Sequence, residues 1–298
     1  MLRYAAIDIG SNAVRLLIAD ITKTEEGFGF KKNTLIRVPL RLGDDAFLDH
    51  HISKRKTEDL LKTMSAFKNL MEVYQVSKYL ACATSAMREA ENGGEIIKEV
   101  KKVCDLDLEI IHGQREANII YANHIEETLD NKKSYLYIDV GGGSTELSVF
   151  VNRIPVASKS FDIGTIRILD NQDREETWEE MKLWVKENTK SLKNLAAIGT
   201  GGNINKLYRM SDEKEGMPMS FLKLKTLYNN LNGHSLKERI QVFGLNPDRA
   251  DVIIPACEIY ITLLKWTGIK QIYVPKVGLA DGIINLLIEE NLSQQRYK

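Results

Sequence analysis

The chain has 298 residues, which is more than one hydrophobic core usually supports and suits two domains of ordinary size. Its 41 basic and 41 acidic side chains cancel, which disfavours a general nucleic-acid binder and means that an anionic partner would need a local cluster of positive groups. No uncharged apolar run approaches about 18 residues, and Asp8 interrupts the first one, so we expect neither a membrane span nor a signal peptide. The three cysteines lack metal-site spacing and lie in apolar surroundings, which indicates reduced, buried thiols in a cytoplasmic protein.

Apolar runs in the first part of the chain alternate with longer segments of helical period, which is the pattern of an α/β domain. Apolar residues between Ser53 and Tyr74 recur at steps of three and four, and Ser53 can cap the first turn, so this segment is predicted to be an amphipathic helix. The other elements predicted here are strands at 4–9, 14–21, 78–84 and 106–113, and a helix at 114–129.

A polar stretch at 130–133 follows, and the second lobe is expected to begin near it, which divides the chain into lobes 1–124 and 125–298. The last helix of the second lobe can return to the hinge between the lobes. The elements predicted in the second lobe are strands at 134–140, 145–151, 154–161 and 195–199, and helices at 175–192, 203–210, 248–266 and 281–292.

One phrase occurs twice, as IDIGSNAVRLLI from residue 7 and as IDVGGGSTELSV from residue 138. Each time an acidic strand end leads into a tight polar turn. The duplication predicts one phosphate-binding hairpin in each lobe, with the two lobes facing each other across a cleft. Aligning the two phrases pairs Asp8 with Asp139, Gly10 with Gly141, and Arg15 with Glu146.

The second copy places three consecutive glycines, Gly141, Gly142 and Gly143, between two strands. Without Cβ atoms, their backbone N–H groups can approach an anion and form a concave donor nest, although a plain hairpin turn is the simpler alternative. The carboxylates at either side, Asp139 and Glu146, are hard oxygen ligands suited to Mg²⁺ or Mn²⁺ bound together with substrate phosphates. The hydroxyls of Ser144 and Thr145 can also donate to phosphate oxygens.

A second glycine turn, IGTGGNINKL, joins a predicted strand to a predicted helix through Gly201 and Gly202. Thr200 or Asn203 can cap that helix, and its N-terminus favours an anion, although a Gly-Gly pair at such a junction is also common structural punctuation. The turn lacks the last glycine of G-x-G-x-x-G, and G-x-x-x-x-G-K-[ST] does not occur. Neither a dinucleotide-binding fold nor a P-loop is therefore supported.

Three charged side chains are placed for phosphate chemistry. Arg15 lies on the first hairpin and Arg88 follows a strand, so both are candidate guanidinium forks for phosphate oxygens. Glu116 lies in the first turn of a predicted helix. Taken alone, Arg88 is better explained by a solvated helix face, and Glu116 by a favourable interaction with the helix dipole, than by a function.

The chain resembles the Ppx/GppA phosphatases, the family of exopolyphosphatases and guanosine pentaphosphate phosphohydrolases. The resemblance implies an α/β fold of two ribonuclease-H-like lobes with an interdomain cleft, as in the actin-like, sugar kinase and heat-shock-protein ATPase superfamily. It covers essentially the whole chain and depends on these segments, in this order: IDIGSNAVRLLIAD, ATSAMREA, IIHGQREANIIY, YIDVGGGSTELSVF, AIGTGGNINKL, PDRADVIIPA and VGLADGIINLL.

The resemblance also implies roles for individual residues. Glu116 matches the family's general base, and Asp139 and Glu146, together with Asp8, are expected at the magnesium site. Arg15 and Arg88 match phosphate-binding arginines. The rest of the expected phosphate-binding set is Ser11, Asn12, Gly141, Gly142, Gly143, Ser144, Thr145, Gly201 and Gly202.

The function implied is hydrolysis of the terminal phosphoanhydride of inorganic polyphosphate with release of orthophosphate, with guanosine pentaphosphate as a second candidate substrate. No organic cofactor, nucleic acid or membrane is expected as a partner, and a homodimer is consistent with the family. Longer members carry a further all-helical HD-like domain that a short form ending near Lys298 would lack. The alternatives are a small-molecule kinase of the same superfamily and a non-catalytic sensor of alarmones or nucleotides.

Overall fold

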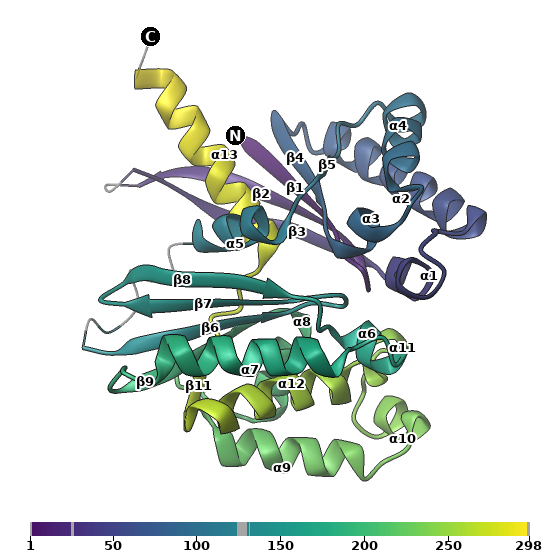
Figure 1. The fold of residues 1–298 in the computed structure, drawn as a ribbon. Coiled ribbons are helices and arrows are strands. Elements are labelled where there is room, and N and C mark those ends of the chain that lie inside the picture. Colours follow the sequence, from purple (N-terminus) through teal and green to yellow (C-terminus); the bar gives the residue numbers. More distant parts are fainter. Residues whose placement is uncertain (1, 25–26, 124–129, 131, 297–298) are drawn as a thin grey trace. The chain divides into compact units, whose positions relative to one another are not determined.

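The computed structural model describes residues 2–24, 27–123, 130 and 132–296. The chain forms two compact units (Figure 1). Unit 1 comprises Met1–Asn123 and Val277–Lys298, and unit 2 comprises His124–Lys276. This division differs from the expected lobes 1–124 and 125–298 at the C-terminal helix, because that helix packs on the sheet of unit 1 rather than on unit 2.

Unit 1 is built on a five-stranded sheet in the order β3-β2-β1-β4-β5. The first three strands pair antiparallel, whereas β1, β4 and β5 run parallel, so their carboxyl ends meet at one edge. The strands are β1 (Arg3–Ile9), β2 (Val14–Thr24), β3 (Gly27–Val38), β4 (Lys78–Ala83) and β5 (Glu109–Ile110).

Helices cover both faces of this sheet. Within unit 1, α2 and α4 pack against each other on one side, while α13 lies along β1 and against α5 on the other (Figure 1). The prediction of an amphipathic helix after Ser53 is confirmed, because the Ser53 side chain accepts a bond from the Lys56 N–H. The helices are α1 (Leu42–Leu48), α2 (Lys54–Val73), α3 (Ser85–Glu89), α4 (Gly93–Cys104), α5 (Gly113–Tyr121) and α13 (Leu279–Arg296).

The crossing of α5 and α13 is very close. A Cβ atom on Gly282 would lie 1.9 Å from the carbonyl oxygen of Ile119, so only glycine allows this contact. The Asn123 side chain donates to the carbonyl of Gly278 at 3.2 Å, which joins the end of α5 to the start of α13. The part of the predicted 114–129 helix from residue 124 onward lies outside the described residues.

Unit 2 repeats the plan of unit 1 with one added strand. Its six-stranded sheet has the order β10-β11-β9-β6-β7-β8, in which β6, β7 and β8 pair antiparallel and β6, β9 and β11 run parallel. The three successive strands predicted at the start of the lobe are confirmed with their bounds. The strands are β6 (Ser134–Val140), β7 (Thr145–Val151), β8 (Ile154–Phe161), β9 (Leu195–Thr200), β10 (Met219–Ser220) and β11 (Gln271–Tyr273).

The helices of unit 2 differ from expectation in two ways. The single helix predicted at 248–266 is broken into α11 and α12 at Asp251 and Val252, and α6, α9 and α10 were not predicted. No helix among the described residues is long and apolar enough to cross a membrane. The helices are α6 (Thr165–Leu169), α7 (Glu175–Thr189), α8 (Gly202–Met210), α9 (Phe221–Asn232), α10 (Leu236–Gln241), α11 (Pro247–Ala250) and α12 (Ile253–Thr267).

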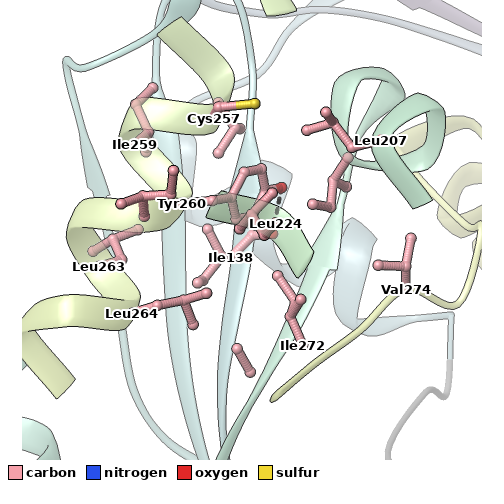
Figure 2. Close-up of a cluster of buried hydrophobic side chains, with 14 of the residues drawn as sticks. Ile138, Leu207, Leu224, Cys257, Ile259, Tyr260, Leu263, Leu264, Ile272 and Val274 are labelled. Atoms are coloured by element: carbon pink, nitrogen blue, oxygen red, sulfur yellow. Dashed lines mark hydrogen bonds between the residues drawn. The ribbon is translucent and has the colours of Figure 1, made fainter. Parts of the chain in front are cut away.

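A buried tyrosine organises the centre of unit 2. Tyr260 of α12 lies among the apolar side chains of the core, and its hydroxyl donates to the carbonyl of Thr200 at 2.7 Å and lies 3.3 Å from that of Ile138 (Figure 2). Gly199 leaves room for the ring, since a Cβ there would lie 3.2 Å from Tyr260 Cε1. Tyr260 thus ties together the carboxyl ends of β6 and β9, where the site residues of unit 2 begin.

Candidate functional site

The two duplicated hairpins match residue for residue. The turn of unit 1 is closed by a bond from the Gly10 N–H to the Ala13 carbonyl at 3.1 Å, and the turn of unit 2 by a bond from the Gly141 N–H to the Ser144 carbonyl at 2.9 Å. Facing pairs on the strands follow the same register: Asp8 with Arg15 and Ile9 with Val14, Asp139 with Glu146 and Val140 with Thr145. The correspondence of Gly10 with Gly141, expected from the repeat, therefore agrees with the turn geometry.

The strand pair beside the turn of unit 1 carries an ion pair. Arg15 Nη1 lies 2.7 Å from Asp8 Oδ2, and the carboxylate is buried. We expected Asp8 at a magnesium site, but in this structure its carboxylate holds the guanidinium of Arg15. The metal role of Asp8 stays a prediction, whereas its contact with a candidate phosphate-binding arginine is a structural fact.

Other expected residues of unit 1 lie at the same edge of the sheet. The hydroxyls of Ser11 and Ser85 are 2.8 Å apart, which joins the turn to the first residue of α3. Arg88, also on α3, donates from Nη1 to the carbonyl of Ile111 at 2.9 Å. The main chain of Asn12 in the turn accepts a bond from the Arg41 N–H at 3.0 Å. Each residue is thus fixed to a neighbouring element.

Glu116 is buried in the first turn of α5. Both Glu116 and Asp8 influence the thiol of Cys82, which pairs with Asp8 across β1 and β4. Burial, followed by the negative charges of Glu109, Asp8 and Glu116, raises the pKa of Cys82 to about 12. Asp8 lies near the carboxyl end of β1 and Glu116 follows the carboxyl end of β5, so both lie at the same end of the parallel part of the unit 1 sheet.

The glycine turn of unit 2 is held from one side through its carbonyl groups. The Gly141 carbonyl accepts from the Thr165 N–H at 3.1 Å, and the Gly142 carbonyl accepts from the Ile166 N–H at 2.8 Å. The Gly143 carbonyl accepts from Arg167 Nε at 2.7 Å. Because C=O and N–H point in opposite directions across a trans peptide, these bonds direct the N–H groups of residues 142–144 to the other side. This is the geometry of a donor nest.

Asp139 and Glu146 face each other across β6 and β7, which places their Cβ atoms about 5 Å apart on one face. Glu146 is only 3% exposed and accepts a bond from the Ser160 hydroxyl at 2.8 Å, and Asp139 is half-buried. Within the described residues no group of three metal-ligating side chains gathers. Two hard carboxylates beside a donor turn nevertheless fit Mg²⁺, which needs one or two carboxylates and takes its other ligands from phosphate and water.

The two hydroxyls after the glycines differ from expectation. Thr145 is fully buried and donates to the carbonyl of Ile163 at 2.6 Å, so its only proton fixes the hairpin to the loop after β8. This geometry does not support the predicted role of Thr145 as a phosphate donor. Ser144 is also buried, at the end of the turn, and its role stays a prediction.

The second glycine turn lies directly beside Asp139. Gly201 has a φ of 100° and is itself the N-cap of α8, so the predicted caps Thr200 and Asn203 are wrong. A Cβ on Gly201 would lie 3.1 Å from Asp139 Oδ1. Arg249 Nη1 donates to the carbonyl of the next residue, Gly202. The turn thus has a carboxylate and a guanidinium as close neighbours.

Sequence reasoning did not assign three residues that shape these turns. Arg167 is a buried cation bonded to Gly143. Tyr260 holds the carboxyl ends of β6 and β9 together. Gly164 packs so tightly on the turn that a Cβ there would lie 2.4 Å from the Gly142 carbonyl oxygen. The phrase DIGTIR, a glycine and an arginine just after a predicted strand, was the available signal.

The strand order of both sheets and the paired hairpins define an α/β protein of two units, each built on a mixed sheet that begins with the same antiparallel hairpin. The chain belongs to the Ppx/GppA phosphatase family, whose model matches residues 21–290. The resemblance noted in the sequence is therefore confirmed at the level of the family.

Two curated relatives match nearly the whole chain. A bifunctional 3-dehydroquinate synthase/phosphatase of Fusobacterium nucleatum is 30% identical over 96% of this chain and 46% of its own length. A guanosine-5'-triphosphate,3'-diphosphate pyrophosphatase of Aeromonas hydrophila is 23% identical over 97% of this chain and 60% of its own length. The chain thus spans about half the length of the curated relatives it matches.

Two solved structures share the fold over almost their full length. An exopolyphosphatase from Cytophaga hutchinsonii superposes with a TM-score of 0.82 at 23% identity, covering 97% of this chain and 98% of that one. A Ppx/GppA family member from Aquifex aeolicus superposes with a TM-score of 0.74 at 24% identity, covering 98% of both chains. At these identities the likeness concerns the fold.

Proposed function

We propose that this protein is an exopolyphosphatase that hydrolyses the terminal phosphoanhydride of inorganic polyphosphate and releases orthophosphate, with guanosine pentaphosphate as a second substrate. The observation that carries this proposal is the glycine turn of unit 2. Its three carbonyls are bound from behind, which leaves successive N–H groups directed to one side as donors for phosphate oxygens. A chain of phosphates is the ligand that such a run of donors suits.

The carboxylate pair supports a metal-assisted reaction. Asp139 and Glu146 would hold Mg²⁺ or Mn²⁺ next to the turn. The ion would neutralise charge on the phosphoryl oxygens as the bond to the leaving phosphate breaks. Asp139 also lies close to the Gly201 turn, since a Cβ on Gly201 would lie 3.1 Å from its Oδ1.

The candidate base and the candidate phosphate-binding arginines lie in unit 1. Glu116 is proposed to orient the water and take its proton, and Arg15 and Arg88 are proposed to bind phosphate oxygens. Asp8 orients Arg15 through its 2.7 Å ion pair, and the Ile111 carbonyl orients Arg88. Hydrolysis rather than transfer to an acceptor is proposed because Glu116 is a buried carboxylate suited to water and the family is one of phosphatases.

The names of relatives support two substrates of the same chemistry. One relative is named for a guanosine-5'-triphosphate,3'-diphosphate pyrophosphatase activity, and one structural neighbour is named an exopolyphosphatase. Both substrates end in a phosphoanhydride, so the same donors and metal would serve either.

Phosphate release is the direct test. Orthophosphate should be measured with long polyphosphate, tripolyphosphate, guanosine pentaphosphate and ATP, each with Mg²⁺ and with chelator. We expect metal-dependent release from polyphosphate that exceeds release from ATP. Transfer of phosphate from ATP to an added hydroxyl compound would indicate a kinase instead, and tight binding of all four without release would indicate a sensor.

A further inference from the structure

We propose that Arg167 is a positioning residue for the glycine turn of unit 2: its guanidinium fixes the Gly143 peptide and places a positive charge directly behind the phosphate-binding N–H groups. The proposal rests on the proposed function only for the identity of the anion as a phosphate chain. Arg167 itself lies on the opposite side of the turn from those donors.

The first observation is the bond itself. Arg167 Nε lies 2.7 Å from the Gly143 carbonyl oxygen. A charged donor makes a stronger bond than a neutral one. Since the Gly143 carbonyl and the Ser144 N–H belong to one planar peptide, a guanidinium holding the carbonyl also sets the direction of that N–H. The last donor of the nest is therefore aimed by Arg167.

The second observation is burial. Arg167 is only 8% exposed, and placing a charge in the interior of a protein is costly. In such surroundings, however, a cation acts more strongly on an anion nearby than it does in water. A buried guanidinium behind the turn thus raises the affinity for a polyanion without touching it.

The third observation comes from the equivalent turn of unit 1. There the Ser11 carbonyl accepts from the Gly43 N–H at 2.9 Å and the Asn12 carbonyl accepts from the Arg41 N–H at 3.0 Å, so both bonds come from the main chain. Asn12 occupies the position of Gly143. The unit 1 turn thus has a main-chain donor at the carbonyl where the unit 2 turn has the guanidinium of Arg167, which brings a positive charge as well as a donor.

The surrounding packing restricts movement of the Arg167 segment. The Thr145 hydroxyl holds Ile163 at 2.6 Å, and Gly164 lies against the peptide between Gly142 and Gly143. The main-chain N–H groups of Thr165 and Ile166 are bonded to the first two glycines, so the segment from residue 163 to residue 167 lies along the turn. Arg167 makes the last of these contacts, the one to the third glycine.

The test uses Arg167→Met, which keeps the length of the stem but removes the charge and the donors, and Arg167→Lys, which keeps a charged donor. Arg209→Gln is the matched control, because Arg209 also donates from Nε to a main-chain carbonyl in unit 2 but lies at the exposed end of α8. Tripolyphosphate affinity is measured by calorimetry in a Glu116→Gln background so that the probe is not consumed, and kcat and KM are measured without that background.

We expect Arg167→Met to weaken tripolyphosphate binding by about ten- to a hundredfold, as for loss of a charge-assisted hydrogen bond. Arg167→Lys should restore most of the affinity, and the control should match the parent. A folded Arg167→Met protein that binds tripolyphosphate like the control would overturn the proposal, as would an Arg167→Lys protein that is as weak as Arg167→Met. Absence of phosphate release in the parent would instead sink the proposed function and leave the affinity test intact.

If Arg167→Met does not fold, the parent protein still decides the question by NMR. On addition of tripolyphosphate, the amide resonances of residues 142–144 and the Nε–H resonance of Arg167 should shift, whereas the Nε–H of Arg209 should not. Shifts at Arg167 without contact to the ligand follow from its bond to Gly143. Unchanged amide resonances at residues 142–144 would contradict the proposal.

Discussion

The β1–β2 hairpin of unit 1 and the β6–β7 hairpin of unit 2 share a register and a turn but differ in charge. Next to the turn, unit 1 has a carboxylate opposite a guanidinium, and unit 2 has two carboxylates facing each other. The turn residues differ in the same way, since Ser11 and Asn12 of unit 1 are replaced by Gly142 and Gly143 in unit 2. The backbone of the hairpin was thus retained while its chemistry diverged.

The difference suggests a division of labour. Under the proposed function, unit 1 contributes arginines that bind phosphate and Glu116 that acts on water, while Asp8 is paired with Arg15. The carboxylate pair of unit 2 is proposed to bind a cation, and the glycine turn beside it to offer N–H donors that no side chain obstructs. Each of the following experiments changes a residue in one unit, so that its effect can be compared with that of a change in the other unit.

The largest effect is expected from Glu116→Gln in unit 1. The amide keeps the size of the side chain but cannot take a proton from water, so turnover should fall by about 10²–10⁴-fold. Affinity for polyphosphate should stay equal or rise, because a negative charge is removed near a polyanion. Turnover, affinity and melting temperature are measured on the same preparation. Near-parental turnover with a lower melting temperature would make Glu116 a helix-dipole residue and remove the base from unit 1.

A smaller effect is expected when a carboxylate beside each turn is replaced, Glu146 in unit 2 and Asp8 in unit 1. Glu146→Gln should raise the Mg²⁺ concentration needed for half-maximal rate by about tenfold or more, because one of two hard ligands loses its charge. Asp8→Asn should raise KM, because Asp8 orients Arg15, and it should change the Mg²⁺ concentration less than Glu146→Gln does unless Asp8 also takes the predicted metal role. Titration of rate against Mg²⁺ and against Mn²⁺ measures both. Equal metal dependence in the two variants would show that the hairpins do not differ in the way proposed.

The smallest effect concerns stability and compares the cores of the two units. Burial, assisted by nearby carboxylates, raises the pKa of Cys82 in unit 1 and of Cys257 in unit 2 to about 12. The folded state then holds its thiol protons more tightly than the unfolded state, so stability is full below about pH 9 and is lost between about pH 9 and 12. At pH 10 the loss is about 1.5 kcal/mol per thiol.

Urea unfolding at pH 7.5 and pH 10 tests this expectation. Replacing either cysteine by alanine removes that thiol's share of the pH dependence, although the variant itself is less stable at both pH values. If the two units unfold in separate steps, each variant marks the step of its own unit. A pH dependence that is identical in the parent and in both variants would contradict the assigned cause.

Much of the fold was predictable because its elements carry strong local signals. The amphipathic period and the Ser53 cap predicted α2, and the short polar turns between apolar runs predicted β6, β7 and β8. The helices α9 and α10 were missed. Only Leu224 and Leu231 of α9 are buried and α10 buries none of its residues, so neither offers a strong apolar period.

The parts of the site that follow from local sequence and strand register could be predicted. The parts that depend on contacts between distant segments could not. The repeat predicted the two turns and the facing pairs beside them, since these follow from strand register. Arg167 and Gly164 were missed because their importance comes from contacts with a turn some twenty residues earlier. The ion pair of Asp8 was missed because a sequence gives the facing positions but not the direction of the side chains.

The contact between α5 and α13 has a consequence for how the protein is made. Unit 1 is discontinuous, and its core includes Leu279, Ile283 and Ile284 of α13, which are synthesised only after the whole of unit 2. At usual rates of translation the first segment of unit 1 waits on the order of ten seconds for the helix that completes it. Unit 2, a continuous segment, can close its sheet first, so a ribosome-bound chain is expected to pass through a stage in which the later unit is folded and the earlier one is not.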